Sequence, residues 1–221
     1  MPQGSEYKAV CRGLSRVGSL KPLVLPIPVG TQPVTKYLER LQQTEHLHYP
    51  SRVLLMGLCG SLSPDYAIGD SIFYRECVYE SNPSPLLLEC DRALTTSLQH
   101  KLRQKSCEVR ALTSDRLIWS RDEKRKLGQI YAAGVVDMEG FATLKVLAQA
   151  GVSVAMIRVV SDDCHHNLPD LTSALSPDGL LQPVPLALGL LRQPVAAAQL
   201  IRGALRGLQV LQQVTTLLFS D

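Results

Sequence analysis

Two acidic side chains near the centre of the chain follow apolar segments and have the types needed for acid–base chemistry. Glu139 follows residues 135–136, and Asp162 follows the apolar run at residues 152–160. A continuous β-branched run of this kind is typical of a strand buried on both faces of a parallel sheet. Because open α/β sheets bind ligands at the carboxyl ends of their strands, we expect both carboxylates to face one crevice. The pattern predicts an active site there.

A strand–helix–strand unit at residues 134–163 would position these acids. Its helical pattern, residues 141–150, is closed by Gly151. Elsewhere the apolar periodicity predicts strands at 23–28, 53–56, 71–77, 86–88 and 109–112, and helices at 6–10 (capped by Ser5), 31–41, 94–105 and 122–133, with Gly134 ending the last. Two C-terminal helices follow, separated by Gln193-Pro194. No repeat or linker interrupts this order, which predicts a single domain at residues 1–221.

Composition narrows the class of protein. The chain has 221 residues, of which 45% are hydrophobic, enough for one large α/β domain with a substantial core. The net charge of +3 is spread among interspersed acids and bases, so we expect no nucleic-acid partner. Residues 1–8 contain no apolar signal core, no apolar run approaches ~18 residues, and the six cysteines form no CxxC pair. We therefore expect a cytoplasmic protein without a transmembrane segment.

Glycines at residues 57 and 60 interrupt an apolar run, and they would let backbone amides approach a ligand. The ordered set of motifs around them resembles the purine nucleoside phosphorylase and nucleosidase superfamily over residues 53–163. These motifs are Gly57-x-x-Gly60-Ser61-Leu62, Ile68-Gly69-Asp70, Asp137-Met138-Glu139-Gly140 and Ile157-Arg158-x-x-Ser161-Asp162. The resemblance implies an α/β fold, a three-layer αβα sandwich around a mixed central sheet. It also implies cleavage of the N-glycosidic bond of a purine nucleoside.

Further segments resemble a narrower branch, the hopanoid-associated phosphorylases. They are Ser114-Asp115-Arg116 leading to Glu123-Lys124, Asn167-Leu168-Pro169, and Ser176-Pro177-Asp178-Gly179. That branch is thought to act on an adenine nucleoside carried by a triterpenoid lipid, and its better-known relatives are the methylthioadenosine/adenosylhomocysteine nucleosidases. The resemblance therefore favours a 5′-modified adenine nucleoside as the small-molecule substrate. It implies no cofactor, with phosphate as a conceivable co-substrate, and a homodimer or larger homo-oligomer.

The chemistry of this reaction gives the acids roles. Cleavage leaves negative charge on the purine and oxocarbenium character on the ribose, so an acid near N7 of the base assists departure. We expect Asp162 to be this acid, with Asp163 as the alternative. Glu139 would accept both ribose hydroxyl protons and favour positive charge on the sugar. Met138 would offer a soft apolar surface beneath the sugar.

The remaining expected substrate contacts are Leu58, Gly60 and Ser161 beside the Gly-rich segment, and Leu117 and Ile118, which with Trp119 would stack on the base or form an oligomer surface. Two of the acids have simpler explanations: Asp162 could cap the turn after its strand, and Glu139 could be a charge favoured at a helix N-terminus. Cys164-His165-His166 lies beside two Asp residues, but adjacent ligands on a short loop rarely share one ion, so we expect no metal.

The sequence offers two candidates for the second substrate, phosphate and water. Phosphate-using members of the superfamily place an arginine before the Gly-rich loop and a serine within it, positions that here resemble Leu55 and Leu58. Neither leucine can bind an anion. Gly4 and Lys8 remain candidates for a phosphate site, since helix N-termini bind anions.

Nucleosidases of the superfamily instead use a glutamate near the end of the first loop to activate water. In the simplest register that position is Ala9, and Glu6 lies about one helical turn upstream. We expect Glu6 to be this base and the reaction to be hydrolytic. A non-catalytic protein that binds purine nucleosides, having lost its activating residues, is the alternative function.

Overall fold

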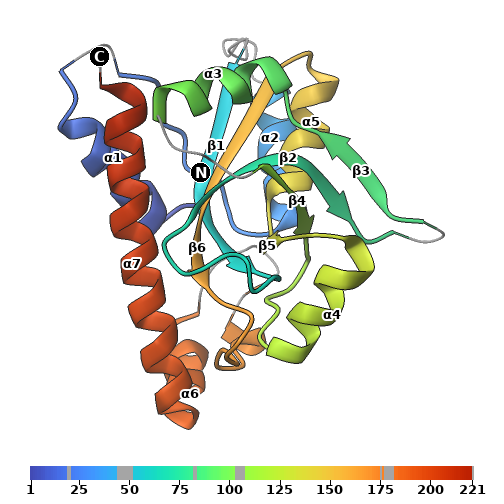
Figure 1. Ribbon diagram of the computed structural model, residues 1–221, viewed down its shortest axis with the longest axis vertical. Coiled ribbons are helices and arrows are strands. Elements are labelled where there is room, and N and C mark those ends of the chain that lie inside the picture. Colours follow the sequence, from blue (N-terminus) through green and yellow to red (C-terminus); the bar gives the residue numbers. More distant parts are fainter. Residues whose placement is uncertain are drawn as a thin grey trace.

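The computed structural model describes residues 1–18, 21–43, 52–81, 84–102, 108–174, 176 and 182–220. Figure 1 shows its elements. The helices are α1 (Ser5–Ser15), α2 (Thr31–Gln43), α3 (Arg92–Leu102), α4 (Arg121–Tyr131), α5 (Gly140–Gln149), the short η1 (Thr172–Ala174), α6 (Pro183–Arg192) and α7 (Pro194–Phe219). The strands are β1 (Arg52–Ser61), β2 (Ser71–Tyr79), β3 (Leu86–Glu89), β4 (Glu108–Thr113), β5 (Val135–Asp137) and β6 (Ser153–Asp162). Residues 103–105 of the expected third helix, and Pro177-Asp178-Gly179 of the branch motif, lie outside the described residues.

The central sheet is mixed, as expected. Its described strands run in the order β3-β2-β4-β5-β1-β6. β1 pairs in parallel with β6, and β4 in parallel with both β2 and β5, whereas β3 is antiparallel to β2 and β5 is antiparallel to β1. β2 also pairs antiparallel with β6, so the sheet curls until these two strands meet.

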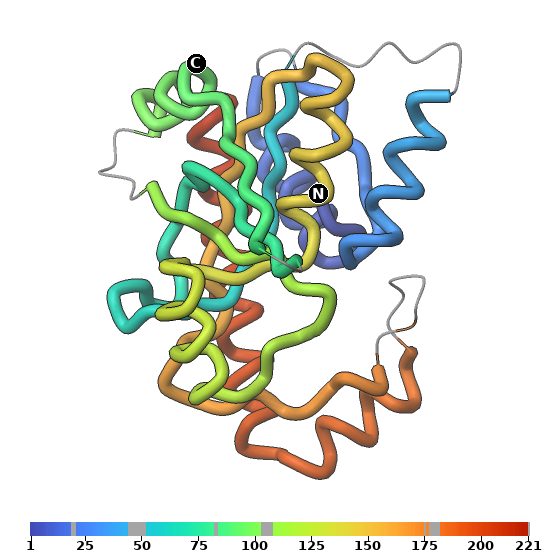
Figure 2. Tube along the Cα trace, turned by 90° about the vertical axis from the view of Figure 1, so that its right-hand side faces the viewer, coloured from blue at the N-terminus to red at the C-terminus, as the bar shows by residue number. Residues whose placement is uncertain are grey.

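Helices cover the sheet on two sides, which confirms the three-layer αβα architecture. The long helix α7 runs along β6 with α1 packed beside it, and α3 contacts both α7 and β6 (Figure 1). On the other side α5 lies against the sheet with α2 outside it, as Figure 2 shows in the turned view. Because both faces of β6 are covered, residues 154–161 are all buried, as the continuous apolar run predicted.

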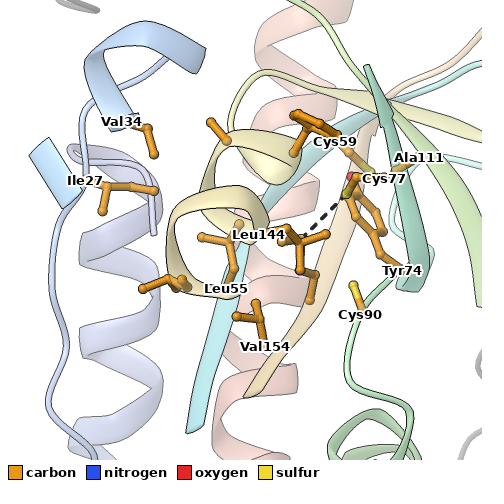
Figure 3. Packing of buried hydrophobic residues seen from close by; sticks show 14 of the residues in the cluster. Ile27, Val34, Leu55, Cys59, Tyr74, Cys77, Cys90, Ala111, Leu144 and Val154 are labelled. Carbon is orange, nitrogen blue, oxygen red and sulfur yellow. Dashed lines mark hydrogen bonds between the residues drawn. The ribbon is translucent and has the colours of Figure 1, made fainter. Parts of the chain in front are cut away.

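The main core lies between the sheet and the α2–α5 layer. Leu55 and Cys59 of β1, Tyr74 and Cys77 of β2, and Leu144 of α5 meet there (Figure 3). A second cluster joins α1 and α7 to the opposite face of the sheet through Val10, Leu211 and Leu218. The described cysteines are free thiols.

Three local predictions were wrong. Residues 23–28 do not form a strand: among them only Ile27 makes a bridge, to Pro2. Gly57 and Gly60 do not break β1, which continues to Ser61 with an irregularity between Cys59 and Gly60. Gly4, with φ 88°, rather than the Ser5 side chain, begins α1.

The ends of α4 and the shape of the C-terminal helices complete the frame. Ser120 caps α4 by accepting a hydrogen bond from the Glu123 N–H, and Ala132 ends it in the left-handed region, two residues before the expected Gly134. α6 is apolar yet has no buried residue. Within the described residues no single helix is long and apolar enough to cross a membrane, although α6 and α7 together, bent by 118°, have sufficient length and apolar composition.

Candidate active site

A buried arginine lies at the centre of a cluster of acids beside β1. Arg158 is fully buried in β6, and its Nη2 lies 3.0 Å from Asp137 Oδ2 and 3.2 Å from Glu139 Oε2. Its Nη1 is directed at the carbonyl oxygen of Leu58, at 3.5 Å. A charge inside a sheet is tolerated only when it is paired, and here two carboxylates pair with it. Although burial opposes it, Asp137 and Glu139 raise the pKa of Arg158 above its usual range.

Glu139 is held from two sides. Its Oε2 meets Arg158, and its Oε1 accepts a hydrogen bond of 3.2 Å from the Gly30 N–H. Burial raises its pKa, while Arg158 opposes that shift. Asp137, two residues earlier, accepts 2.8 Å from Thr113 Oγ1 and 3.2 Å from the Gly140 N–H, which fixes the start of α5. These contacts hold Glu139 as an acceptor at the edge of the cluster.

Glu6 approaches the same cluster from α1. Its Oε2 accepts a hydrogen bond of 3.0 Å from the Leu58 N–H. Gly57 makes this approach feasible, because a Cβ atom there would collide with both Glu6 Oε2 and Arg158 Nη1. The two side chains therefore lie over the same face of one β1 residue.

The environment of Glu6 suits a general base. Burial of its carboxylate raises the pKa of Glu6 to about 7, with Arg158 pulling in the opposite direction and Glu139 adding to the rise. A base whose pKa lies near neutral pH combines availability with proton affinity. A water molecule bound at Glu6 would also lie beside the Arg158–Glu139 pair.

Asp162, at the end of β6, forms a separate group with a buried lysine. Its Oδ2 forms an ion pair with Lys124 Nζ, and its Oδ1 accepts 3.0 Å from Ser161 Oγ. Gly60 makes room for this carboxylate, since a Cβ at Gly60 would come within 2.7 Å of Asp162 Oδ2. Ser161 Oγ also lies 3.2 Å from the Cys59 carbonyl oxygen, which fixes the serine against β1.

Asp163, the alternative acid, has a structural task. Its Oδ1 accepts hydrogen bonds from the backbone N–H groups of His165 and His166, at 2.9 and 3.0 Å, and contacts His166 Nδ1 at 3.0 Å. Burial opposes the shift, but these hydrogen bonds lower the pKa of Asp163. These bonds tie Asp163 to the backbone of its own loop, whereas the Asp162 carboxylate lies against Gly60 of β1.

The Arg158 cluster and the Asp162–Lys124 pair both border β1. The prediction that Glu139 and Asp162 follow strands ending at the same edge of the sheet was wrong. β5 runs antiparallel to β1 while β6 runs parallel to it, so β5 and β6 do not end at the same edge of the sheet. Because β5 is antiparallel to β1, the chain after β5 runs back toward Gly57. This brings Glu139 to Arg158, which is paired with Gly57 in the sheet. Arg158 and Asp162 are four residues apart on one strand, roughly 13 Å. The site is elongated along residues 57–60.

The other residues expected to contact the substrate differ in how far they are buried. Met138 is half-buried beside Glu139, and its carbonyl oxygen accepts from Thr31 Oγ1 at 3.3 Å. Leu117 and Trp119 are half-buried, but Ile118 is only 4% exposed and packs with Leu62 and Leu112 in the core. The prediction that Ile118 lies on an exposed oligomer surface was therefore wrong.

Leu55 and Leu58, the two leucines expected at the phosphate-ligand positions, have their side chains in different places. The Leu58 side chain packs beside Gly207 of α7, so its backbone rather than its side chain belongs to the site. Leu55 is buried in the core and lines an apolar cavity of about 470 Å³ with Leu38 and Leu147. Gly4 and Lys8 are exposed at the start of α1.

Three charged residues of the site had been quoted only as parts of motifs, without a role at the site: Arg158, Asp137 and Lys124. The sequence could have predicted an ion pair at Arg158, because a charged residue inside an apolar strand must find a buried partner. The sequence gives no sign that Lys124 is buried, since it stands among the other charged residues of a helix whose exposed face is equally charged.

Comparisons with known proteins identify the family and the fold of the chain. The family model described as the Phosphorylase superfamily matches residues 10–175. No curated protein sequence matches the chain. Among solved structures, futalosine hydrolase of Helicobacter pylori strain 26695 is similar at a TM-score of 0.70 and 15% identity, over 98% of this chain and 94% of that one.

Two nucleosidase structures are also similar. The Helicobacter pylori 5′-methylthioadenosine/S-adenosyl homocysteine nucleosidase matches at a TM-score of 0.67 and 15% identity, over 96% of this chain and 92% of that one. The Arabidopsis thaliana 5′-methylthioadenosine nucleosidase matches at 0.65 and 17% identity, over 98% and 91%. At such low identity these likenesses show a common fold.

Proposed function

The chain belongs to the phosphorylase superfamily, and we propose that within it this protein is a nucleosidase, an enzyme that hydrolyses the N-glycosidic bond of a purine nucleoside. The observation that carries this proposal is the Glu6 carboxylate, which has a pKa of about 7 and lies against the Arg158–Glu139 pair. A base poised near neutral pH next to a diol-binding carboxylate is what hydrolysis of a riboside requires.

The ribose would lie over residues 57 and 58 of β1. Glu139 accepts the protons of its two hydroxyl groups, and Arg158 holds Glu139 in place through Oε2. A carboxylate there favours the positive charge that develops on the sugar as the C1′–N9 bond breaks. Met138, half-buried beside Glu139, would pack against the sugar.

Water is the nucleophile that the electrostatics favour. Three carboxylates, Glu6, Asp137 and Glu139, surround one guanidinium, that of Arg158. A phosphate dianion brought into such a cluster would meet like charges, whereas water needs only a base within hydrogen-bond reach. Glu6 would remove its proton as the oxygen attacks C1′. Asp162, beside Gly60, would protonate N7 of the departing base.

The preferred substrate is a 5′-modified adenine nucleoside. Support comes from the similar structures, whose names identify nucleosidases of methylthioadenosine and adenosylhomocysteine and a hydrolase of futalosine. Leu117 would contribute to the base pocket, with Gly60 and Ser161 shaping the wall next to Asp162.

Product analysis tests this function. The protein is incubated with methylthioadenosine, adenosine and inosine, each with and without phosphate, and the free base and sugar products are separated. We expect adenine and a free ribose derivative, at a rate unaffected by phosphate. Formation of a ribose 1-phosphate derivative would show phosphorolysis, in which case Gly4 and Lys8 become the anion site. Tight binding of these nucleosides without release of base would instead identify a nucleoside-binding protein.

We also expect a homo-oligomer located in the cytoplasm, with Leu117 and Trp119 as candidate contact residues. Sedimentation at micromolar concentration checks the oligomeric state, and a clean monomer would contradict it. Separate fractionation of cells checks the location.

A further inference from the structure

Lys124 is an uncommon residue to find without any exposed side-chain surface. Its side chain is 0% exposed, although lysine is among the residues least often buried. Nζ pairs with Asp162 Oδ2 and also donates 2.9 Å to the carbonyl oxygen of Asp163. Burying an ammonium group is costly unless it is paired. The position of Lys124 beside the candidate acid therefore needs an explanation.

The position of Lys124 is built by the contacts between α4 and the loop after β6. The Arg121 N–H donates 2.9 Å to Asn167 Oδ1, and Arg125 Nε donates 3.0 Å to the Cys164 carbonyl oxygen. The Leu168 N–H donates 2.9 Å to the Trp119 carbonyl oxygen, just before the helix. These bonds attach the loop to the first turn of α4 and so direct Lys124 at Asp162.

The hydrogen bonds of Asp162 limit what it can do alone. Its Oδ2 accepts from Lys124 Nζ, and its Oδ1 lies 3.0 Å from Ser161 Oγ, whose single proton is also within reach of the Cys59 carbonyl oxygen. A carboxylate oxygen that accepts a hydrogen bond from an ammonium group has no proton of its own to donate. The acid step at N7 therefore requires a proton from a neighbouring group, and Lys124 is bonded directly to the carboxylate and carries one.

We propose that Lys124 is the source of the proton that Asp162 delivers to the purine, an inference that rests on the proposed function. As the C1′–N9 bond breaks, its electron pair moves into the base. The proton moves from Lys124 Nζ to Asp162 Oδ2 and from Oδ2 to N7, so the base leaves neutral and Lys124 is left as an amine. The proton taken from the attacking water resides on Glu6, and exchange with solvent after product release restores both groups.

The direction of this transfer is physically reasonable. A proton passing from the ammonium to the carboxylate removes two opposite charges together, so the fully buried Lys124 side chain is not left with an unpaired charge. Lys124 acts through Asp162 and needs no contact with the substrate. The rival explanation is a purely structural ion pair that holds Asp162 and the loop in place.

Leaving-group dependence separates these two roles. Nitrophenolate leaves p-nitrophenyl β-D-ribofuranoside without being protonated, whereas adenine needs a proton at N7. Turnover of this riboside and of methylthioadenosine is measured for the wild type, Lys124→Met and Lys124→Arg. Arginine keeps the positive charge and the ion pair but does not give up its proton. Lys126→Met, at an exposed position of the same helix, is the control.

We expect both Lys124 variants to lose about 100-fold or more in kcat for adenine release, while hydrolysis of the nitrophenyl riboside changes by less than about threefold. Equal losses on both substrates would show a structural role and overturn the inference, as would adenine release by Lys124→Arg at the wild-type rate. Lys124→Arg retains the ion pair, so it decides the matter if Lys124→Met fails to fold. A wild type that cleaves neither substrate would instead refute the proposed function, and the inference with it.

Discussion

Buried charges mark the two ends of the site. Arg158 meets Asp137 and Glu139, and Lys124 meets Asp162, so each basic group inside the fold has an acidic partner. Breaking such a pair from one side leaves an uncompensated charge, at a cost of about 3–5 kcal/mol. Substitutions at these residues therefore change stability as well as activity.

Glu6 gives a pH dependence with a defined sign. Burial raises its pKa from 4.5 to about 7, so the ionised base, and with it kcat, should increase as the pH rises through about 7. Glu6→Gln should lose about 100-fold or more in kcat together with this dependence, because the amide still accepts from the Leu58 N–H but binds no proton. Rate profiles between pH 5 and 9 check it, and an unchanged profile would exclude Glu6 as the base.

Thermal unfolding gives an independent check on Glu6. Because its folded-state pKa is raised, the native protein binds a proton more tightly than the unfolded chain, and this stabilisation is lost as the pH rises from 4.5 to about 7. Glu6→Gln binds no such proton, so its stability does not fall in this way over the same pH range. The Tm of the variant relative to the wild type should therefore be higher at pH 8 than at pH 5.

Asp162→Asn should reduce adenine release by about 100-fold or more while nucleoside affinity stays within about tenfold, since the amide has a similar shape and no acidic proton. It should also lower the free energy of unfolding by about 3–5 kcal/mol, because Lys124 loses its counter-ion. Single-turnover kinetics and denaturant titration measure the two effects.

The matched control is Asp163→Asn, which weakens the hydrogen bonds to His165 and His166 but leaves Asp162 in place. If this variant loses base release and Asp162→Asn retains it, the assignment of the acid is reversed.

Glu139→Gln should raise KM and lower kcat together, because the ribose diol then faces only one accepting oxygen. The preference for a ribonucleoside over its 2′-deoxy form should shrink in the same variant. Kinetics with both sugars measure this preference, and Glu39→Gln, exposed on α2, is the control. Equal binding of the two sugars by the wild type would count against the role of Glu139.

At the scale of elements, β1 is the strand along which the site is assembled. Glu6 from α1 and Arg158 from β6 meet over Gly57, and Asp162 meets Gly60 three residues later. α4 contributes Lys124 only because the loop after β6 bonds to its first turn. A change in the β1 backbone should therefore affect both ends of the site.

Gly57→Ala tests the role of β1. Its methyl group would displace Glu6 and Arg158, so we expect a destabilisation of about 1–3 kcal/mol and a loss of turnover larger than that stability change explains. Gly18→Ala, where an added Cβ meets nothing within 4 Å, should leave both properties unchanged. Normal activity of Gly57→Ala would mean that the two side chains need not approach this strand.

At the scale of the whole molecule, the two C-terminal helices differ in how much of their surface they bury. α7 buries Leu211 and Leu218 completely against α1 and the sheet, whereas α6 buries none of its residues. The sheet and its two covering layers thus carry the stability of the described fold, and α6 lies at its margin (Figure 1).

Leu211→Ala should lower the free energy of unfolding by about 2–5 kcal/mol, since it opens a cavity where the side chain is 0% exposed. Leu188→Ala on α6, 50% exposed, should change it by less than about 0.5 kcal/mol. Urea titrations of both variants measure the contrast. A large effect at Leu188 would show that α6 is covered in solution.

The sequence alone determined the features that depend on neighbouring residues. The apolar run of β6, the helix α5 closed by Gly151, and the break between α6 and α7 are local patterns, because strand and helix periodicity are written within a few residues. The four motifs between Gly57 and Asp162, taken together, also predicted the superfamily and the mixed three-layer fold.

Tertiary structure decided what depends on residues far apart in the chain. Residues 23–28 remain outside the sheet and β5 runs antiparallel to β1, because strand pairing depends on partners that local periodicity does not specify. Glu6 lies 52 residues from Leu58, and Lys124 lies 38 residues from Asp162. The pKa of Glu6 and the counter-ion of Asp162 arise from burial and pairing, which exist only once the helices pack onto the sheet.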